Sequence, residues 1–298
     1  MSTFADISKG MAEVVTQASP SIVRVEARRR LPATGIVWSA DGVIVTANHV
    51  VRAEEGIVIG LSDGSTTAAT VLGRDRSTDL AILKADSSDL TPLTETNKQE
   101  LGVGNLVLAL GRPGKTVQAT LGVVSALGDG WRTGRGGHID RYLQTDVIMY
   151  PGFSGGPLVD ASGQLVGLNT SALARGVSLT IPTATVARIT ASLQEHGRIR
   201  RGYLGVSTQR ARIPETLRDK LNQQKRGLLI VSVEPKSPAD EAGLTLGDTI
   251  VTMNGEAIQS HDDLLAQLNG DQVGTAVSVQ ILRGGQIENI DVVVGERN

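Results

Sequence analysis

Three segments of the sequence each place one reactive side chain beside a strand or a tight turn. A histidine ends the apolar run Val43–Val51, an aspartate opens the apolar run that ends at Leu83, and a serine lies in the glycine-rich segment Asp146–Leu158. The three side chains are those of His49, Asp79 and Ser154. A serine hydroxyl becomes a nucleophile when a base lies within hydrogen-bond reach and a carboxylate orients that base. The three residue types together therefore predict the chemistry of a hydrolase.

Glycines surround the serine in the segment Gly152–Phe153–Ser154–Gly155–Gly156–Pro157–Leu158. Such a turn lets successive backbone N–H groups point at one spot beside the hydroxyl, which is what an oxyanion hole requires. Taken alone, His49 is more often a structural histidine, and Asp79 is more often a strand cap. The combination of all three is specific, because their chain order is that of chymotrypsin-type double barrels.

From Ile22 onward, short segments rich in Val, Ile and Leu alternate with Gly, Asp and Pro. This pattern indicates a mostly β protein, built as a barrel or a sandwich. The stretch Gly128–Gly137 is expected to be a mobile loop. The predicted strands are Ser21–Val25, Gly42–Thr46, Gly56–Leu61, Ala81–Leu83, Leu106–Leu110 and Thr120–Ser125.

A helix is predicted over residues 4–18, at the start of the chain. It places Phe4, Ile7 and Met11 on one face at helical spacing. That face either docks on the helix's own domain or contacts another subunit.

A second helix, predicted over residues 183–196, closes the first part of the chain. Thr183 is its expected N-cap and Gly197 its expected end. The basic segment Arg198–Arg201 then reads as a linker, so the domain boundary is placed there. The module beyond it has predicted strands Leu228–Val233, Thr249–Met253 and Val277–Leu282, and a helix opened by the capping pair Ser260 and Asp263.

With these elements in place, the sequence resembles the HtrA/DegP (protease Do) family of serine proteases with one C-terminal PDZ domain. The family motifs TNNHV, TDLAVLK and GNSGGPL are matched by Thr46–Val50, Thr78–Lys84 and Gly152–Leu158. The resemblance implies a mostly β chain with a chymotrypsin-like double β-barrel protease domain over residues 1–197. A small α+β PDZ domain over residues 198–298 is expected to follow.

The resemblance also implies roles for the site residues. His49 is the general base, Asp79 holds its tautomer, and Ser154 attacks the scissile carbonyl. The backbone N–H groups of Gly152, Phe153 and Ser154 are the candidate oxyanion donors, of which the family uses the first and the last.

The sequence departs from the family beside the serine. Phe153 replaces the usual Asn, and Met149–Tyr150 replaces Asn before the proline. Phe153 is expected to reshape the cleft or to favour an inactive loop, which affects substrate preference and resting activity but not the reaction type. The small, aromatic-poor residues Ser178, Leu179 and Ile181 predict a modest apolar specificity pocket for Val, Ala or Ile.

The C-terminal module carries a loop, Tyr203–Leu204–Gly205–Val206, that resembles the PDZ loop whose N–H groups bind a peptide's terminal carboxylate. An extended C-terminus is expected to add a strand between the segment after this loop and the helix of Leu264 and Leu268. His261, in the first turn of that helix, is expected to face solvent; the alternative is a contact with a ligand hydroxyl.

Composition excludes several other classes of function. The 298 residues suggest about two domains, and 29 basic against 31 acidic residues argue against nucleic acid as a partner. The chain has no cysteine and no histidine at metal-ligand spacing, so neither a metal nor another cofactor is predicted. The sequon Asn169–Thr170–Ser171 lies in a predicted strand, and no role is assigned to it.

The sequence also sets expectations for location. No apolar run approaches the roughly 20 residues of a membrane-spanning helix, and the first residues show no basic-then-apolar signal peptide. The expected location is therefore the cytoplasm, or the periplasm or cell envelope if the sequence has been trimmed.

Three functions compete. The leading hypothesis, implied by the resemblance, is an ATP-independent serine endopeptidase acting on unfolded or misfolded proteins. It is expected to be a homotrimer whose PDZ domain recruits peptide C-termini or regulates the site. The alternative is a chaperone-like or binding protein with an intact but mostly resting triad, in which Phe153 plugs the cleft. A pure PDZ scaffold leaves the triad unexplained.

Overall fold

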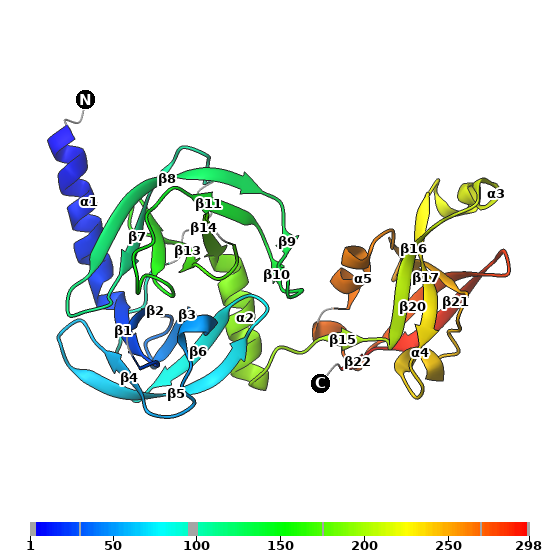
Figure 1. Cartoon of the computed structure of the whole chain (residues 1–298), viewed down its shortest axis with the longest axis horizontal. Helices are drawn as coiled ribbons and strands as arrows, with labels where there is room; N and C mark the ends of the chain where they lie inside the picture. Colours follow the sequence, from blue (N-terminus) through cyan, green and yellow to red (C-terminus); the bar gives the residue numbers. More distant parts are fainter. Residues whose placement is uncertain (1–3, 30, 95–100, 175, 269, 297–298) are drawn as a thin grey trace. The chain divides into compact units, whose positions relative to one another are not determined.

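The computed structural model describes residues 4–29, 31–94, 101–174, 176–268 and 270–296. The chain divides into two compact units, Met1–Ile199 and Arg200–Asn298 (Figure 1). Each unit has its own hydrophobic core. The expected boundary after residue 197 falls two residues before this division.

Six antiparallel strands close the first barrel of the N-terminal unit in the spatial order β1-β2-β3-β6-β5-β4 (Figure 1). The strands β2 and β3 are buried along their whole length, because their core also holds Leu168 and Ile181 from the second barrel. The strands are β1 (Ile22–Glu26), β2 (Ala33–Val37), β3 (Val43–Ala47), β4 (Ile57–Gly60), β5 (Thr66–Asp75) and β6 (Leu80–Ala85).

The second barrel is closed by six strands in the order β11-β14-β13-β12-β7-β8. A separate hairpin, β9 (Trp131–Arg132) with β10 (His138–Ile139), follows β8. All six strands predicted between residues 21 and 125 overlap observed strands. The barrel strands are β7 (Leu106–Gly111), β8 (Gln118–Gly128), β11 (Tyr142–Thr145), β12 (Pro157–Asp160), β13 (Leu165–Thr170) and β14 (Ser178–Pro182).

The first helix, α1 (Phe4–Ala18), is docked at one end only. Val14 and Ala18 pack against strands of the second barrel through Leu108 and Val159. Phe4, at the other end of α1, is 92% exposed, and the helix projects away from the barrels there (Figure 1). A short 3-10 turn, η1 (Ser19–Ser21), leads from α1 into β1.

The helix α2 (Thr183–His196) closes the N-terminal unit and ends, as predicted, at Gly197, which adopts the left-handed conformation with φ 69°. The predicted N-cap at Thr183 is wrong, because β14 runs directly into the helix and Pro182 occupies the cap position. The Thr183 hydroxyl instead donates to the carbonyl of Leu165 at 3.2 Å.

The C-terminal unit is built on an antiparallel sheet in the order β16-β17-β18-β20-β21, with β19 beside β18. The helix α5 (His261–Gln267) begins with a capping box formed by Ser260 and Asp263, as the sequence predicts. The strands are β15 (Gly202–Tyr203), β16 (Val206–Arg212), β17 (Arg226–Val233), β18 (Thr249–Met253), β19 (Glu256–Ala257), β20 (Ala276–Arg283), β21 (Gln286–Val293) and β22 (Gly295–Glu296). The remaining helical segments are α3 (Glu215–Arg218), η3 (Asp219–Leu221), α4 (Pro238–Glu241) and η4 (Gly270–Gln272).

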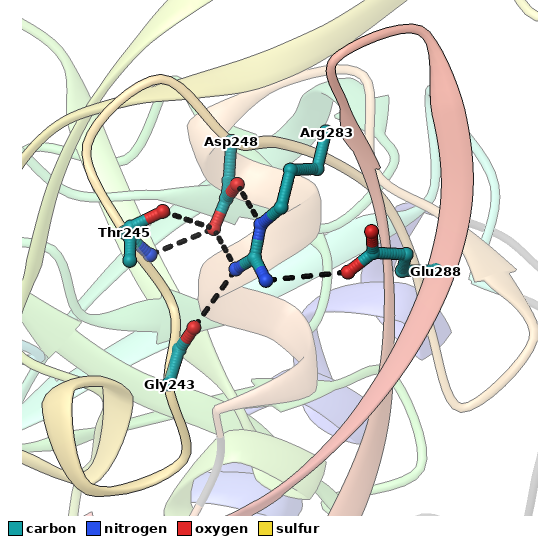
Figure 2. A network of polar contacts seen from close by, with 5 residues as sticks. All are labelled: Gly243, Thr245, Asp248, Arg283 and Glu288. Carbon is teal, nitrogen blue, oxygen red and sulfur yellow. Dashed lines mark hydrogen bonds and ion pairs between the residues drawn. The ribbon is translucent and has the colours of Figure 1, made fainter.

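A buried carboxylate ties the loop before β18 to the hairpin β20–β21 (Figure 2). Arg283 donates to both oxygens of Asp248, at 2.8 and 2.7 Å, and also to the carbonyl of Gly243 and the carboxylate of Glu288. The backbone N–H of Thr245 donates to Asp248 as well. Burial by itself would raise the pKa of Asp248, but the hydrogen bonds and charge of Arg283 and the hydrogen bonds from Thr245 outweigh it and lower that pKa.

We expect Asp248→Asn to lower the free energy of unfolding of the C-terminal unit by about 2 kcal/mol at pH 7, because it removes a charge-assisted pair. Since folding lowers the pKa of Asp248, its stabilisation is complete above the unfolded pKa and is lost as the pH falls through the folded pKa. The difference between variant and wild type is therefore constant at neutral pH and narrows as the pH falls below about 4. Calorimetric unfolding from pH 7 to pH 3 measures both effects. The exposed Asp291 in β21 supplies the control, Asp291→Asn. An equal loss there, or a difference as large at pH 3 as at pH 7, contradicts the prediction.

Candidate active site

The segment 150–156, which we call the oxyanion turn, folds back on itself before β12. The backbone N–H of Phe153 donates to the carbonyl of Tyr150 at 3.0 Å, and Gly152 has φ +93°. Proline at the second position and a positive φ at the third are the features of a type II turn. The sequence Tyr-Pro-Gly-Phe therefore dictates this conformation locally.

In the oxyanion turn, the backbone N–H groups on the two sides of Phe153 are left unpaired among the described residues. The N–H of Gly155 donates to the carbonyl of Asn169, whereas those of Gly152 and Ser154 make no hydrogen bond within the described residues. Phe153 is therefore corrected as a predicted oxyanion donor, because its N–H is bonded to the carbonyl of Tyr150. The candidate donors that remain are the N–H groups of Gly152 and Ser154. Two unpaired donors on either side of one residue can bind an oxygen that gains negative charge.

The side chain of Phe153 lies inside the second barrel and has no exposed surface. Its ring occupies the space that a side chain at position 111 would need, since a Cβ at Gly111 would lie 2.6 Å from Cδ1 of Phe153. The ring of Tyr150 meets it edge-on, with the centroids 5.7 Å apart. The expectation that Phe153 plugs or reshapes the cleft is therefore wrong, because the barrel core accommodates the phenyl group.

His49 and Asp79 are held together by two hydrogen bonds. His49 lies in the 3-10 turn η2 (Asn48–Val50), directly after β3. Its Nδ1 is 2.8 Å from Oδ2 of Asp79, and its backbone N–H donates to Oδ1 at 2.9 Å. Asp79 itself is buried and has φ +63°, a conformation that aspartate tolerates better than most residues. The carboxylate can thus orient the imidazole and fix which ring nitrogen carries the proton.

Ser154 is brought to the same place by the close packing of the next residue. A Cβ at Gly155 would lie 2.2 Å from Oγ1 of Thr46 and 3.0 Å from the backbone nitrogen of Ala47. The oxyanion turn therefore lies against the end of β3, from which His49 follows two residues later. In the described part of the chain, the hydroxyl of Ser154 bonds to that of Ser171 at 3.2 Å, and no hydrogen bond joins it to His49.

Two further hydroxyls at the site were missed by the sequence analysis. Thr170 donates to Oδ2 of Asp79 at 2.5 Å, and Ser171 contacts the nucleophile candidate. Both lie in the sequon that was given no role. The available signal was their place at the end of the strand β13, of which Thr170 is the last residue and after which Ser171 follows directly.

The structure differs from the expectations for the loop 128–137 and for the specificity pocket. The stretch 128–137, expected to be a loop, carries part of the β9–β10 hairpin, and its Thr133 hydroxyl donates to the carbonyl of Ser77 at 2.7 Å. Of the predicted pocket residues, Leu179 and Ile181 are buried in the barrel. Only Ser178 is partly exposed, and its hydroxyl donates to the carbonyl of Val147.

In the C-terminal unit, the loop 203–206 presents unpaired donors at a free sheet edge. The carbonyls of Leu204 and Gly205 accept hydrogen bonds, whereas their N–H groups make none within the residues described. The adjoining strand β16 is an edge strand. His261 is exposed, as predicted, but its Nε2 also lies 2.9 Å from the carbonyl of Thr208 in β16. An extended peptide ending in a carboxylate fits both features.

Comparison with known proteins gives the same division of the chain. Residues 33–168 match the model of a trypsin-like peptidase domain and residues 202–294 that of a PDZ domain. The serine endoprotease from Yersinia pestis has a crystal structure similar to this chain, with a TM-score of 0.78 and 31% identity over 96% of this chain and 98% of that one. The HtrA-type protease AlgW with a tripeptide has a TM-score of 0.79 at 31% identity, over 96% and 97% of the two chains. These matches confirm the expected chymotrypsin-like double barrel followed by a PDZ domain.

Curated relatives carry related names. A probable periplasmic serine endoprotease, DegP-like, from Pseudomonas putida is 36% identical over 269 residues, which is 88% of this chain and 55% of the relative. One from Halomonas elongata is 34% identical, over 90% of this chain and 57% of the relative. The chain thus spans about half the length of these relatives. Among its described helices, none is long and apolar enough to cross a bilayer, and its described residues contain no group of three or more potential metal ligands.

Proposed function

Because the chain belongs to the HtrA-type family of serine proteases, we propose that it is a serine endopeptidase in which Ser154, His49 and Asp79 carry the reaction. The observation behind this proposal is the Asp79–His49 pair, held beside a turn whose Gly152 and Ser154 N–H groups are unpaired. A structural histidine would not need a buried carboxylate and a second hydroxyl, that of Thr170, arranged behind it.

In the proposed reaction, Oδ2 of Asp79 accepts the hydrogen on Nδ1 of His49, which leaves Nε2 free to accept a proton. The Ser154 hydroxyl exchanges its Ser171 partner for Nε2 and attacks the scissile carbonyl carbon as the proton moves to His49. The developing oxyanion accepts hydrogen bonds from Gly152 and Ser154. His49 then returns the proton to the leaving amine, and water releases the acyl group by the same steps.

The proposed substrates are unfolded or misfolded proteins, cut without ATP. Support comes from the relatives, which are named serine endoproteases, and from the free edge of β16 beside the loop 203–206. In this proposal, that loop binds the carboxylate of a peptide C-terminus and either recruits the substrate or regulates the protease domain. The chaperone-like alternative is not favoured, because Phe153, its expected plug, lies in the barrel core instead of the cleft.

The proposed location is the periplasm or the cell envelope. The relatives from Pseudomonas putida and Halomonas elongata are named periplasmic proteases. Their names do not support the cytoplasmic expectation and agree with its alternative. Release with the periplasmic fraction on osmotic shock is expected, and retention with cytoplasmic markers would contradict it.

Cleavage of an unfolded casein substrate tests the protease directly. We expect wild type to degrade it and Ser154→Ala to lose at least about 10³-fold in rate, because the nucleophile is gone. A fluorophosphonate probe, which labels activated serines, should label wild type only. Absence of both cleavage and labelling in the folded wild type, with PDZ-binding peptides added, would contradict the proposal and favour the chaperone-like reading.

Carboxylate recognition is tested with a labelled decapeptide that has an apolar last residue, using full-length Ser154→Ala to prevent cleavage. Amidation of its C-terminus should weaken binding at least about tenfold, because a charge-assisted contact is lost. Gly205→Ala should also weaken peptide binding at least about tenfold, because its Cβ would lie 2.1 Å from Cβ of Ser237 and the loop would have to shift. Gly285→Ala, at nearly the same φ (+82° against +83°) but with nothing within 4 Å of its Cβ, is the matched control. Equal binding of acid and amide would contradict carboxylate capture.

A homotrimer, with the exposed end of α1 as a subunit contact, is also proposed. Phe4 and Ile7 lie on the part of α1 that does not pack on the barrels, and Ile7 is 41% exposed. The double change Phe4→Ser and Ile7→Ser should convert a trimer to smaller species in analytical ultracentrifugation. Leu246→Ser, which removes an exposed apolar residue of the C-terminal unit, should leave the mass unchanged. An unaltered trimer in the double variant would exclude this contact.

A further inference from the structure

The N–H of Ser154 belongs to the Phe153–Ser154 peptide. The peptides before and after it are both held in place by hydrogen bonds. The Gly152–Phe153 peptide is bonded at both ends, its carbonyl to Thr34 Oγ1 at 2.7 Å and its N–H to Tyr150 at 3.0 Å. The Ser154–Gly155 peptide is also bonded at both ends, to the N–H of Thr34 at 3.3 Å and to the carbonyl of Asn169 at 2.9 Å.

Two of these four hydrogen bonds come from one residue of the first barrel. Thr34 is the second residue of the fully buried strand β2 and has no exposed surface. Its N–H and its hydroxyl both reach across to the second barrel. Its own carbonyl accepts the hydroxyl of Thr46 at 2.7 Å, which fixes the strand from the other side.

The direction of the Thr34 hydroxyl is itself fixed. The backbone N–H of Arg112 donates to this oxygen at 2.9 Å, so the hydroxyl hydrogen is directed to its remaining acceptor, the Gly152 carbonyl. The next residue, Pro113, packs under the turn, because a Cβ at Gly152 would lie 2.6 Å from Cβ of Pro113.

Arg112 is anchored in turn to the base of α1. Its buried side chain donates to the carbonyls of Ile22 and Lys115 at 2.7 and 2.8 Å, and to both the carbonyl and the hydroxyl of Ser19. Arg112 therefore contacts the segment that joins α1 to β1 through its guanidinium and supports the oxyanion turn through its backbone N–H.

We propose that Thr34 is a positioning residue for the oxyanion hole: its hydroxyl, held by Arg112, orients the turn so that the N–H groups of Gly152 and Ser154 face the reacting carbonyl. The inference rests on the proposed protease function, because it assigns these two groups to the oxyanion. Thr34 lies outside the three sequence motifs. The first barrel, which already carries the general base His49, thereby also helps to position the oxyanion hole.

Thr34→Val keeps the shape and removes the hydroxyl, and Thr34→Ser keeps the hydroxyl. We expect Thr34→Val to lower kcat about 10- to 100-fold on a fluorogenic peptide that wild type cleaves, with KM changed less than about twofold, since a misplaced donor acts in the transition state. Thr34→Ser should restore kcat to within about threefold of wild type.

A second buried threonine supplies a matched control. The hydroxyl of Thr185 also donates one hydrogen bond and accepts one, to and from Asp140 at 2.6 and 2.9 Å, and the residue has no exposed surface. Thr185→Val removes the same chemistry away from the oxyanion turn, so it should cost stability while leaving kcat unchanged. The proposal is overturned if Thr34→Val keeps the kcat of wild type, if Thr34→Ser is as slow as Thr34→Val, or if Thr185→Val loses as much.

Amide hydrogen exchange of Phe153 and Gly155 measures how firmly the oxyanion turn is held, and it does not require catalytic activity. Both N–H groups are hydrogen-bonded in it, and we expect their exchange to accelerate about tenfold in Thr34→Val but not in Thr185→Val. Comparison of wild type with Ser154→Ala decides the proposed function separately. If wild type proves inactive while exchange accelerates, the support of the turn by Thr34 stands and the protease function fails. Unchanged exchange in Thr34→Val overturns the inference whatever the activity.

Discussion

The turn that carries Ser154 passes closer to the first barrel than any side chain would allow. A Cβ at Gly155, where φ is +89°, would lie 2.1 Å from the carbonyl oxygen of Thr34. The rest of the site depends on this approach. It brings the serine to the end of β3, where His49 follows, and it lets the backbone of β2 hydrogen-bond to the turn. The two barrels are thus joined beside the candidate catalytic residues His49 and Ser154.

Much of this arrangement is visible in the sequence because its signals are local. Alternating apolar strands and turn residues predict the barrels, and the capping pair Ser260–Asp263 predicts the start of α5. The tight turn at Gly152 follows from Pro-Gly at its centre. His49 and Asp79 are recognisable since each adjoins an apolar strand, and the structure places them in direct contact.

What the sequence does not reveal depends on contacts between residues far apart in the chain. Thr34 and Thr170 have the pattern of ordinary strand threonines, and only the tertiary fold turns their hydroxyls toward Gly152 and Asp79. The direction of the Phe153 side chain also depends on a contact with a distant residue. A glycine at position 111, more than forty residues earlier, provides the space that draws its ring into the core. Packing of this kind overrides expectations drawn from neighbouring residues.

The free edge of β16 has a consequence for the behaviour of the protein in concentrated solution. An unpaired edge strand is a template for any extended chain, including another copy of itself, and so favours aggregation. Here two exposed arginines, Arg210 and Arg212, lie on that strand, and the imidazole of His261 covers one of its carbonyls. Like charges oppose self-pairing of two such edges, while a chain that ends in a carboxylate meets no such repulsion. The same strand is thereby protected against association with itself and left open to a ligand of opposite charge.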